Sequence, residues 1–356
     1  MNKHLLLPFS GAFVFTTFAL NTFANVYVAA DRTHEGFEVG ASLLLLQSEL
    51  SSDLTQYAIF DTVNYNIVTE ETKITNMNDK NVFGLYDVGF DVFMGYVWKN
   101  GQDLFIEYTY YQDQGGSSST CEFESHTNYQ NCSAYPSGQH FHGDASGHFS
   151  TMLNEADVLF GQRFIIGERM DLHFFAGVTA AWIKVGIDQH YEELRGFNID
   201  TGSYMDASYD SDFRGIGPKV GFDGAYQIAR SPIYIFMGAS VAGLVGQTSA
   251  QSSEFIFDPE GTDTGLTTYD GGEENSFVPN LNAEIGLLYE YKISKKYTAE
   301  VMLGYMVSEY YDAVRHLAPY GASTGDGGTP EYNNTLIESN SNYSLNGPYL
   351  TLSALF

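Results

Sequence analysis

Three observations predict that this chain is all-β, a transmembrane antiparallel up-and-down barrel of about ten strands with short periplasmic turns and long extracellular loops. Large apolar residues alternate with small or polar ones along much of the chain, the pattern of strands whose two faces meet different surroundings. The connections between these segments are alternately short and long, as in outer-membrane barrels. The chain also begins with an export signal.

The N-terminal segment carries that signal. A short polar head precedes an apolar run over 5–20, and Thr22-Phe23-Ala24 places small residues at the cleavage positions. We predict cleavage after Ala24, which divides the chain into a signal peptide, 1–24, and one barrel domain, 25–356. A cut after Ala30 and a retained membrane anchor are the alternatives.

The strands follow in order, and the clearest of them covers 85–98. Its even-numbered positions from Tyr86 to Trp98 are large and apolar, and Asn100-Gly101 then provides a tight hairpin turn. The same alternation predicts strands at about 36–48, 83–99, 103–112, 154–166, 171–187, 213–228, 232–247, 279–293, 297–309 and 343–356. Long polar loops are expected at about 49–82, 113–153, 188–212, 248–278 and 310–342.

The two faces of these strands favour lipid over a soluble core. The faces opposite the bulky apolar residues carry Gly, Ser, Ala and Asn with scattered charges, which suits a lumen inside and lipid outside. Because open strand edges are not tolerated in lipid, the sheet has to close. The lumen-facing charges predicted in this way are Asp87, Asp91, Glu107, Asp157, Arg163, Lys219, Glu284, Glu290, Lys292 and Glu300. A secreted soluble β-protein is the rival fold.

The charge balance narrows the classes of partner. Acidic residues outnumber basic ones 44 to 16 in the 356-residue chain, for a net charge of −28. Nucleic acid is excluded as a partner, since a polyanion would be repelled and no basic patch is present. A helical membrane protein is excluded too, because past the N-terminus no stretch approaches the ~20 apolar residues that a spanning helix needs.

The chain has two cysteines, Cys121 and Cys132, which lie in a Gly-, Ser- and Asn-rich stretch. Export implies an oxidising compartment, so a disulfide within this loop is the first interpretation. Metal binding and free thiols are the alternatives.

No pattern predicts an enzyme, a cofactor or a defined metal site. Clusters of His and Asp in the loops could in principle bind a metal or transfer protons, but nothing in the sequence fixes their geometry. These candidates are His140, His142, Asp144 and His148 for a metal, and His190 with Asp188 and His316 with Asp312 for acid–base chemistry.

The C-terminal strand and three internal segments carry a resemblance to known proteins. The last strand alternates up to a terminal aromatic, Phe356, which resembles the assembly signal of bacterial outer-membrane barrels. The segments 36–41, 214–221 and 346–352 resemble the Legionella major outer membrane protein family. This resemblance implies a pore-forming barrel exposed at the cell surface, and it supplies no catalytic residues.

The expected function is therefore a porin-like pore that passes small solutes or ions and prefers cations, with acidic loops at its mouth. The alternative is a closed barrel that acts as a surface adhesin or host-interaction protein. About eight strands can fill their own interior and 16–18 leave a channel, so ten strands lie near the closed end. The expected partners are outer-membrane lipid and lipopolysaccharide, the barrel-assembly machinery, small solutes or ions, and host surface molecules.

Overall fold

The computed structural model describes most of the chain after residue 34. The described residues are 35–51, 56–66, 71–81, 86–121, 128–134, 140–141, 143–167, 169–193, 202–229, 231–257, 265–294, 297–321 and 334–356. The predicted signal peptide lies outside them and stays a prediction. In the described part of the chain, no helix is long and apolar enough to cross a membrane.

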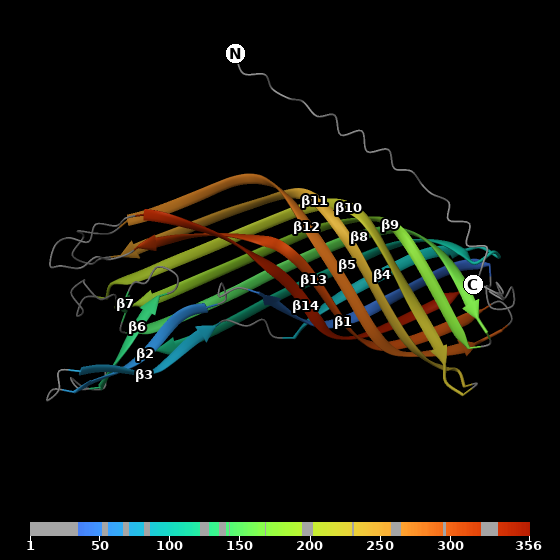
Figure 1. Cartoon of the computed structure of the whole chain (residues 1–356), viewed down its shortest axis with the longest axis horizontal. Helices are drawn as coiled ribbons and strands as arrows, with labels where there is room; N and C mark the ends of the chain where they lie inside the picture. The colour runs from blue at the N-terminus through green and yellow to red at the C-terminus, as the bar shows by residue number, and fades with distance from the viewer. Residues whose placement is uncertain are drawn as a thin grey trace, which may run out of the picture.

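Ten antiparallel strands form a closed barrel in the order β1-β14-β13-β12-β11-β10-β9-β8-β5-β4, as predicted (Figure 1). Their bounds are β1 Gly36–Leu50, β4 Asp87–Val97, β5 Gln102–Thr120, β8 Asp144–Ile166, β9 Met170–Glu192, β10 Tyr204–Gln227, β11 Ile233–Phe257, β12 Gly265–Lys292, β13 Thr298–Gly321 and β14 Asn334–Leu355. Each barrel strand pairs with the barrel strands before and after it in the chain, and the first and last, β1 and β14, pair with each other to close the ring.

Several strands are longer than predicted and run into segments expected to be loops. β5 continues to Thr120, β8 begins at Asp144, and β12 begins at Gly265. The outer faces of the β5 and β8 extensions are polar, so they lack the run of exposed apolar residues on which the prediction depended, whereas the β12 extension keeps only Leu266 and Phe277 as exposed large apolar residues. The extensions lie at the end of the barrel that carries the long connections, called here the long-loop end.

The opposite end, the short-turn end, carries the tight turns, the start of β1 at Gly36 and the end of β14 at Leu355. At the first turn, Gly101 has φ 78° and its N–H donates to the carbonyl of Trp98 at 3.0 Å. The N–H of Trp98 in turn donates to the carbonyl of Gln102 at 2.8 Å. Only a residue that tolerates positive φ fits such a turn easily, which explains the Asn-Gly signal in the sequence.

An apolar belt covers the outside of the barrel. All ten barrel strands contribute to it an outward-facing large apolar side chain that is exposed. One example from each strand, in chain order, is Leu43, Val92, Ile106, Val158, Val178, Val220, Val241, Ile285, Leu303 and Leu352. A belt of this kind suits contact with hydrocarbon rather than water.

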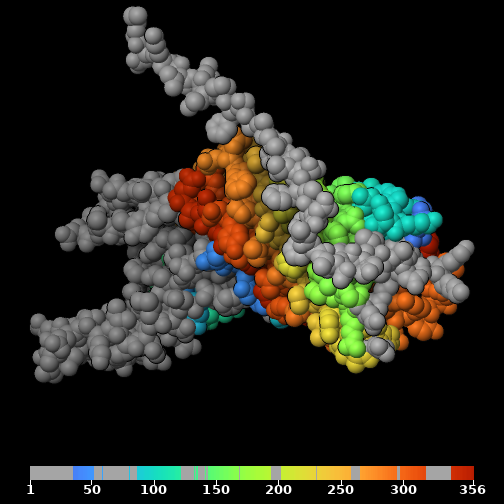
Figure 2. Space-filling view, turned by 45° about the vertical axis from the view of Figure 1, so that its right-hand side comes forward, coloured from blue at the N-terminus to red at the C-terminus, as the bar shows by residue number. Residues whose placement is uncertain are grey.

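Strands β1 and β14 close the barrel (Figure 2 shows blue residues of β1 beside the red and orange end of the chain). Their pairing runs from Glu38 opposite Leu355 to Leu50 opposite Tyr343. At the short-turn end Phe356 continues the pairing, because its N–H and C=O bond to the C=O and N–H of Phe37 at 2.9 and 2.8 Å. Its role as an assembly signal stays a prediction.

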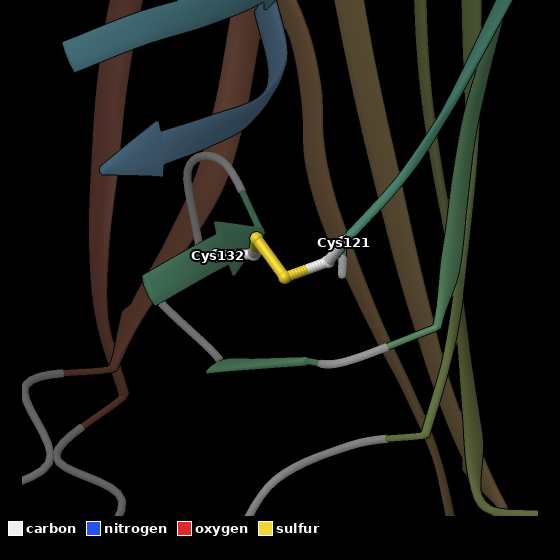
Figure 3. Close-up of a disulfide and its surroundings, with 2 residues drawn as sticks. All are labelled: Cys121 and Cys132. Atoms are coloured by element: carbon white, nitrogen blue, oxygen red, sulfur yellow. A yellow bond between two sulfur atoms is a disulfide. The ribbon is translucent and has the colours of Figure 1, made fainter. Parts of the chain in front are cut away.

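A second sheet, which the sequence did not predict, lies at the long-loop end. Its order is β3-β2-β6-β7, with β2 Gln56–Asn66, β3 Glu71–Asn81, β6 Asn128–Ala134 and β7 His140–Phe141. The predicted disulfide is present: Cys121, directly after β5, is bonded to Cys132 on β6 (Figure 3). The bond therefore ties this sheet to the barrel wall.

Strand β13 leaves the barrel wall at the long-loop end. Its pairing with β12 stops at Asn280–Tyr310, and a bulge with Asp312 at φ 56° follows. The continuation lies against the inner face of β10, where the N–H of Arg315 donates to Ser211 Oγ at 3.1 Å. The β13–β14 hairpin thus turns into the mouth of the barrel.

Candidate functional site: the barrel interior

The interior of the long-loop half is an apolar core. Every barrel strand except β4 contributes to one contiguous cluster of buried apolar side chains, as far as the described residues go. One member from each strand, none more than 1% exposed, is Leu46, Tyr111, Phe149, Ile183, Phe213, Leu244, Val278, Tyr310 and Tyr343. The expectation of a small and polar inner face is wrong for this half, because the ring is narrow enough for large side chains to meet across it.

The inward-turned hairpin completes this core. The His316 and Tyr209 rings lie 4.7 Å apart, and Leu317 is only 2% exposed. Arg315 anchors the hairpin by donating to Glu338 at 2.5 Å and to the carbonyl of Gly271 at 3.2 Å. Burial lowers the pKa of His316 to about 4, since no acid compensates the loss of solvent.

Below the apolar core lies a cavity of about 220 Å³, lined by both charged and apolar side chains. Lys219 on β10 donates to Glu155 at 2.9 Å and to Asp157 at 2.5 Å, both on β8. Glu155 also accepts from the hydroxyl of Tyr310, which reaches it from β13. The cluster therefore links three strands across the lumen.

A second acidic group lines the same cavity on β4 and β5. Asp91 accepts hydrogen bonds from Ser42 and Thr109, each at 3.2 Å. Glu107 lines the cavity beside it, within hydrogen-bonding reach of Asp91. Two acidic side chains are thus in contact without a basic residue bonded to either among the described ones.

An ion-pair network lies nearer the short-turn end. Arg163 bridges Glu38 at 3.4 Å and Asp103 at 3.3 Å. His173 then links Asp103 to Asp223, at 3.1 and 2.8 Å. These five residues come from five strands, β1, β5, β8, β9 and β10, so the network ties the wall together at this level.

A glycine makes the Asp103–His173 contact possible. A Cβ atom on Gly161 would overlap both the His173 ring and the Asp103 carboxylate. The position is buried between two neighbouring strands, β5 and β9, whose side chains meet over it. Gly161 is therefore needed here for close approach rather than for an unusual backbone angle.

The remaining predicted lumen residues lie along the same inner positions. Glu284 accepts from Tyr349 at 2.7 Å and lines the cavity, and Glu300 accepts from Ser353 at 3.4 Å. Glu290 pairs with Lys292 at 3.2 Å near the short-turn end, where the Lys292 side chain is 57% exposed. Asp87, at the long-loop end of β4, is partly buried.

Sequence reasoning missed several members of these clusters. Glu155 could have been found, because it lies two residues before Asp157 and must share its face of β8. The same alternation puts Tyr310 and His173 on inward faces, but it does not show which strands they meet across the lumen. Glu38 and Asp103 belong to the same missed set.

The structure places some of the candidate acid–base and metal residues, and in part with other partners than the sequence suggested. His190 bonds Asp206 rather than Asp188, at 2.6 Å, on the outer wall of the long-loop end. Among the described residues, no set of three or more His, Cys, Asp or Glu is placed to hold a metal ion. His142 and the side chain of His140 lie outside the described residues.

The closed ring and the apolar belt on its outside define an outer-membrane β-barrel. A family model described as the Legionella pneumophila major outer membrane protein precursor matches residues 30–356. The chain belongs to this family, as its segments suggested, and it is an outer-membrane protein. The long-loop end is then the extracellular end.

Other comparisons found barrels of remote similarity. The outer membrane protease OmpT of Escherichia coli has 11% identity and a TM-score of 0.37, with 90% of this chain and 97% of that chain covered. The Pseudomonas putida toluene transporter TodX has 10% identity and a TM-score of 0.33, with 90% of each chain covered. The Ralstonia pickettii toluene transporter TbuX has 10% identity and a TM-score of 0.29, with 91% of this chain and 90% of that chain covered. No curated protein matches.

Proposed function

We propose that this protein is a closed barrel that displays its long loops and its second sheet on the cell surface, as an adhesin or host-interaction protein. The supporting observation is the apolar core of the extracellular half, to which nine of the ten barrel strands contribute buried side chains. Water and solutes do not pass through a close-packed apolar interior. The inward-turned β13–β14 hairpin adds to the same closure.

The displayed surface is acidic on its described outer wall. The exposed acids of the strand extensions include Asp188, Asp206, Asp210 and Glu273. A surface of one sign attracts partners of the opposite sign over about a Debye length, ~8 Å at physiological salt. We propose host surface molecules with basic patches as partners, beside lipopolysaccharide, outer-membrane lipid and the assembly machinery.

Two measurements test this proposal. Folded protein in a planar bilayer should show no stable conductance. Cells that carry a version with 56–81 replaced by a short linker should assemble the barrel but bind host cells less than cells with the full chain. Stable conductance, or unchanged host-cell binding by the shortened chain, would contradict the display function.

A cation-preferring pore is the second candidate, and the acidic middle of the lumen favours it. If the barrel conducts, the excess of lumen acids over bases should attract cations. Replacing Asp87→Asn together with Asp91→Asn should then lower cation preference even at 1 M KCl, since buried charges are screened less than exposed ones. Reversal potentials across a KCl gradient measure this, and anion preference of the unmodified protein would exclude it.

We further propose that the protein is not an enzyme. The described residues include two sets of His–Asp contacts. His173 with Asp103 and Asp223 forms part of an ion-pair network between strands, and His190 bonds Asp206 on the outer wall. A hydrolase site needs a nucleophile or an activated water within reach of its base. Incubation of the folded protein with a general peptide and a phospholipid substrate should give no product, and turnover of either would contradict this proposal.

A further inference from the structure

The mid-barrel cavity holds more acid than base. Its lining includes six carboxylates and a single basic residue, Lys219. The six acids are Asp91, Glu107, Glu155, Asp157, Asp223 and Glu284. Among the described residues, only Asp223 is bonded to a basic group from outside the lining, His173. Five carboxylates therefore share one lysine in a space of about 220 Å³.

One of these carboxylates is incompletely bonded. Asp157 is 3% exposed, and its Oδ2 receives a hydrogen bond from Lys219. Asp157 lines the cavity, and its Oδ1 is buried without a hydrogen-bond partner among the described residues. A buried, unpaired carboxylate oxygen is costly unless a donor from outside the protein reaches it.

The other acids form two groups on opposite walls. Asp91 and Glu107 lie on β4 and β5, and Glu284 lies on β12. In the ring, β12 is separated from β4 by three strands in one direction and from β5 by four in the other. Each group is bonded to neutral donors: Ser42 and Thr109 bond Asp91, and the Tyr349 hydroxyl bonds Glu284.

Apolar side chains also line the cavity, beside the Lys219 cluster on β8 and β10. Leu44, Leu153, Phe175, Met302 and Met306 line the same cavity. An ammonium ion is a strong donor to carboxylates, and a methylene chain packs well on aliphatic and thioether side chains. We propose that this cavity binds a small organic dication, a short alkyl diamine, with one ammonium on each acidic group.

Size and geometry favour this ligand over a bare metal ion. A dry cavity of ~150 Å³ in another protein holds benzene, so the present cavity can hold a short diamine. No described set of three or more acids and histidines is arranged for direct metal coordination. The diamine site is independent of the proposed display function, because a diamine can bind inside a barrel that does not conduct.

The experiment uses the full mature chain, folded in detergent in the presence or absence of the probe, with folding checked by the gel shift of unboiled samples. Binding of 1,4-diaminobutane, butylamine and MgCl₂ is measured by native mass spectrometry and calorimetry. The diamine should bind about tenfold or more tightly than butylamine, which corresponds to one additional ammonium–carboxylate contact.

Variants locate the site. Glu284→Gln removes one end, and Asp91→Asn combined with Glu107→Gln removes the other, so each variant should lower diamine affinity at least about tenfold, to the level of butylamine. Asp188→Asn, an exposed acid on the outer wall, is the matched control and should leave the affinity unchanged. If Glu284→Gln does not fold, the double variant Asp91→Asn with Glu107→Gln tests diamine binding at the opposite end of the cavity.

Three results would overturn the proposal. They are the absence of saturable diamine binding to the folded chain, Mg²⁺ binding that equals or displaces the diamine, and an equal loss of affinity in Asp188→Asn. If the diamine does not bind, protons neutralise the carboxylates of the cavity. If Mg²⁺ equals or displaces the diamine, the ligand is a hydrated metal ion. None of them bears on conductance or host-cell binding, so the display function is tested separately.

Discussion

The extracellular half of the barrel interior is packed with apolar side chains, whereas its middle and periplasmic end are packed with charged ones. The apolar half is stabilised by contact area, which many different side chains can supply. The charged half depends on specific partners, such as Lys219 between Glu155 and Asp157. Single substitutions should therefore have different consequences in the two halves.

Truncation in the apolar half should have the largest effect. Phe213→Ala leaves a cavity in a fully buried site, so unfolding free energy should fall by about 3–5 kcal/mol. Denaturant titration in micelles measures it. Leu266→Ala is the control, because Leu266 is 67% exposed, and it should change stability by no more than ~0.5 kcal/mol. Equal losses in both variants would contradict the packed core.

Removing the buried cation from the charged middle should cost slightly less. Lys219→Met leaves Glu155 and Asp157 without their counter-charge, which should lower the unfolding free energy by about 3 kcal/mol. The exposed pair Lys184–Asp212, 3.6 Å apart, is the matched control, and Lys184→Met should cost under ~1 kcal/mol.

A compensating variant separates charge from packing in this cluster. If buried charge causes the loss, Lys219→Met should recover stability when Glu155→Gln and Asp157→Asn are added, since the carboxylates are then neutral. No recovery in denaturant titration would mean that the lysine stem acts through packing instead.

Acid should loosen the hairpin at the mouth before it affects the barrel wall. The pKa of His316 is lowered from 6.5 to about 4, so its neutral state stabilises the closed hairpin fully above pH 6.5. This stabilisation is lost as the pH falls from about 6.5 towards 4, because the open hairpin binds a proton more readily. The groups near His316 are Tyr209, the neighbouring Arg315, and Glu254, which acts on Tyr209.

Amide hydrogen exchange of β13 at pH 7 and pH 4.5 measures this loosening. Exchange beyond the bulge should rise at pH 4.5, while Val301 to Val307 in the barrel wall stay protected. His316→Phe keeps a ring against Tyr209 without a titratable group, so it should remove most of the pH effect. An unchanged pH effect in that variant would assign it to other groups.

Reduction of the disulfide should have the smallest effect on the barrel. The bond between Cys121 and Cys132 closes a short loop, worth only ~2–3 kcal/mol in the chain-entropy model, and it lies outside the barrel wall. Dithiothreitol should therefore raise the protease sensitivity of the second sheet while the unboiled gel mobility of the barrel stays the same. Unfolding of the barrel on reduction would contradict this separation.

The sequence by itself determined the barrel. Alternation with period two identified all ten barrel strands, because lipid demands apolar residues on one face and strand geometry repeats every second residue. Short segments of sequence also predicted the Asn100-Gly101 turn, the disulfide between the two cysteines and the family.

Only the tertiary structure decided what fills the interior. Alternation places Glu155, Phe213 and Tyr310 on inward faces, but it does not say which of them meet, because the tilt and register of the strands set those distances. The inward turn of the β13–β14 hairpin depends on a bulge that no periodic pattern marks. The same sequence pattern is therefore compatible with an open or a packed lumen. The packing of side chains across the ring determines which of the two forms.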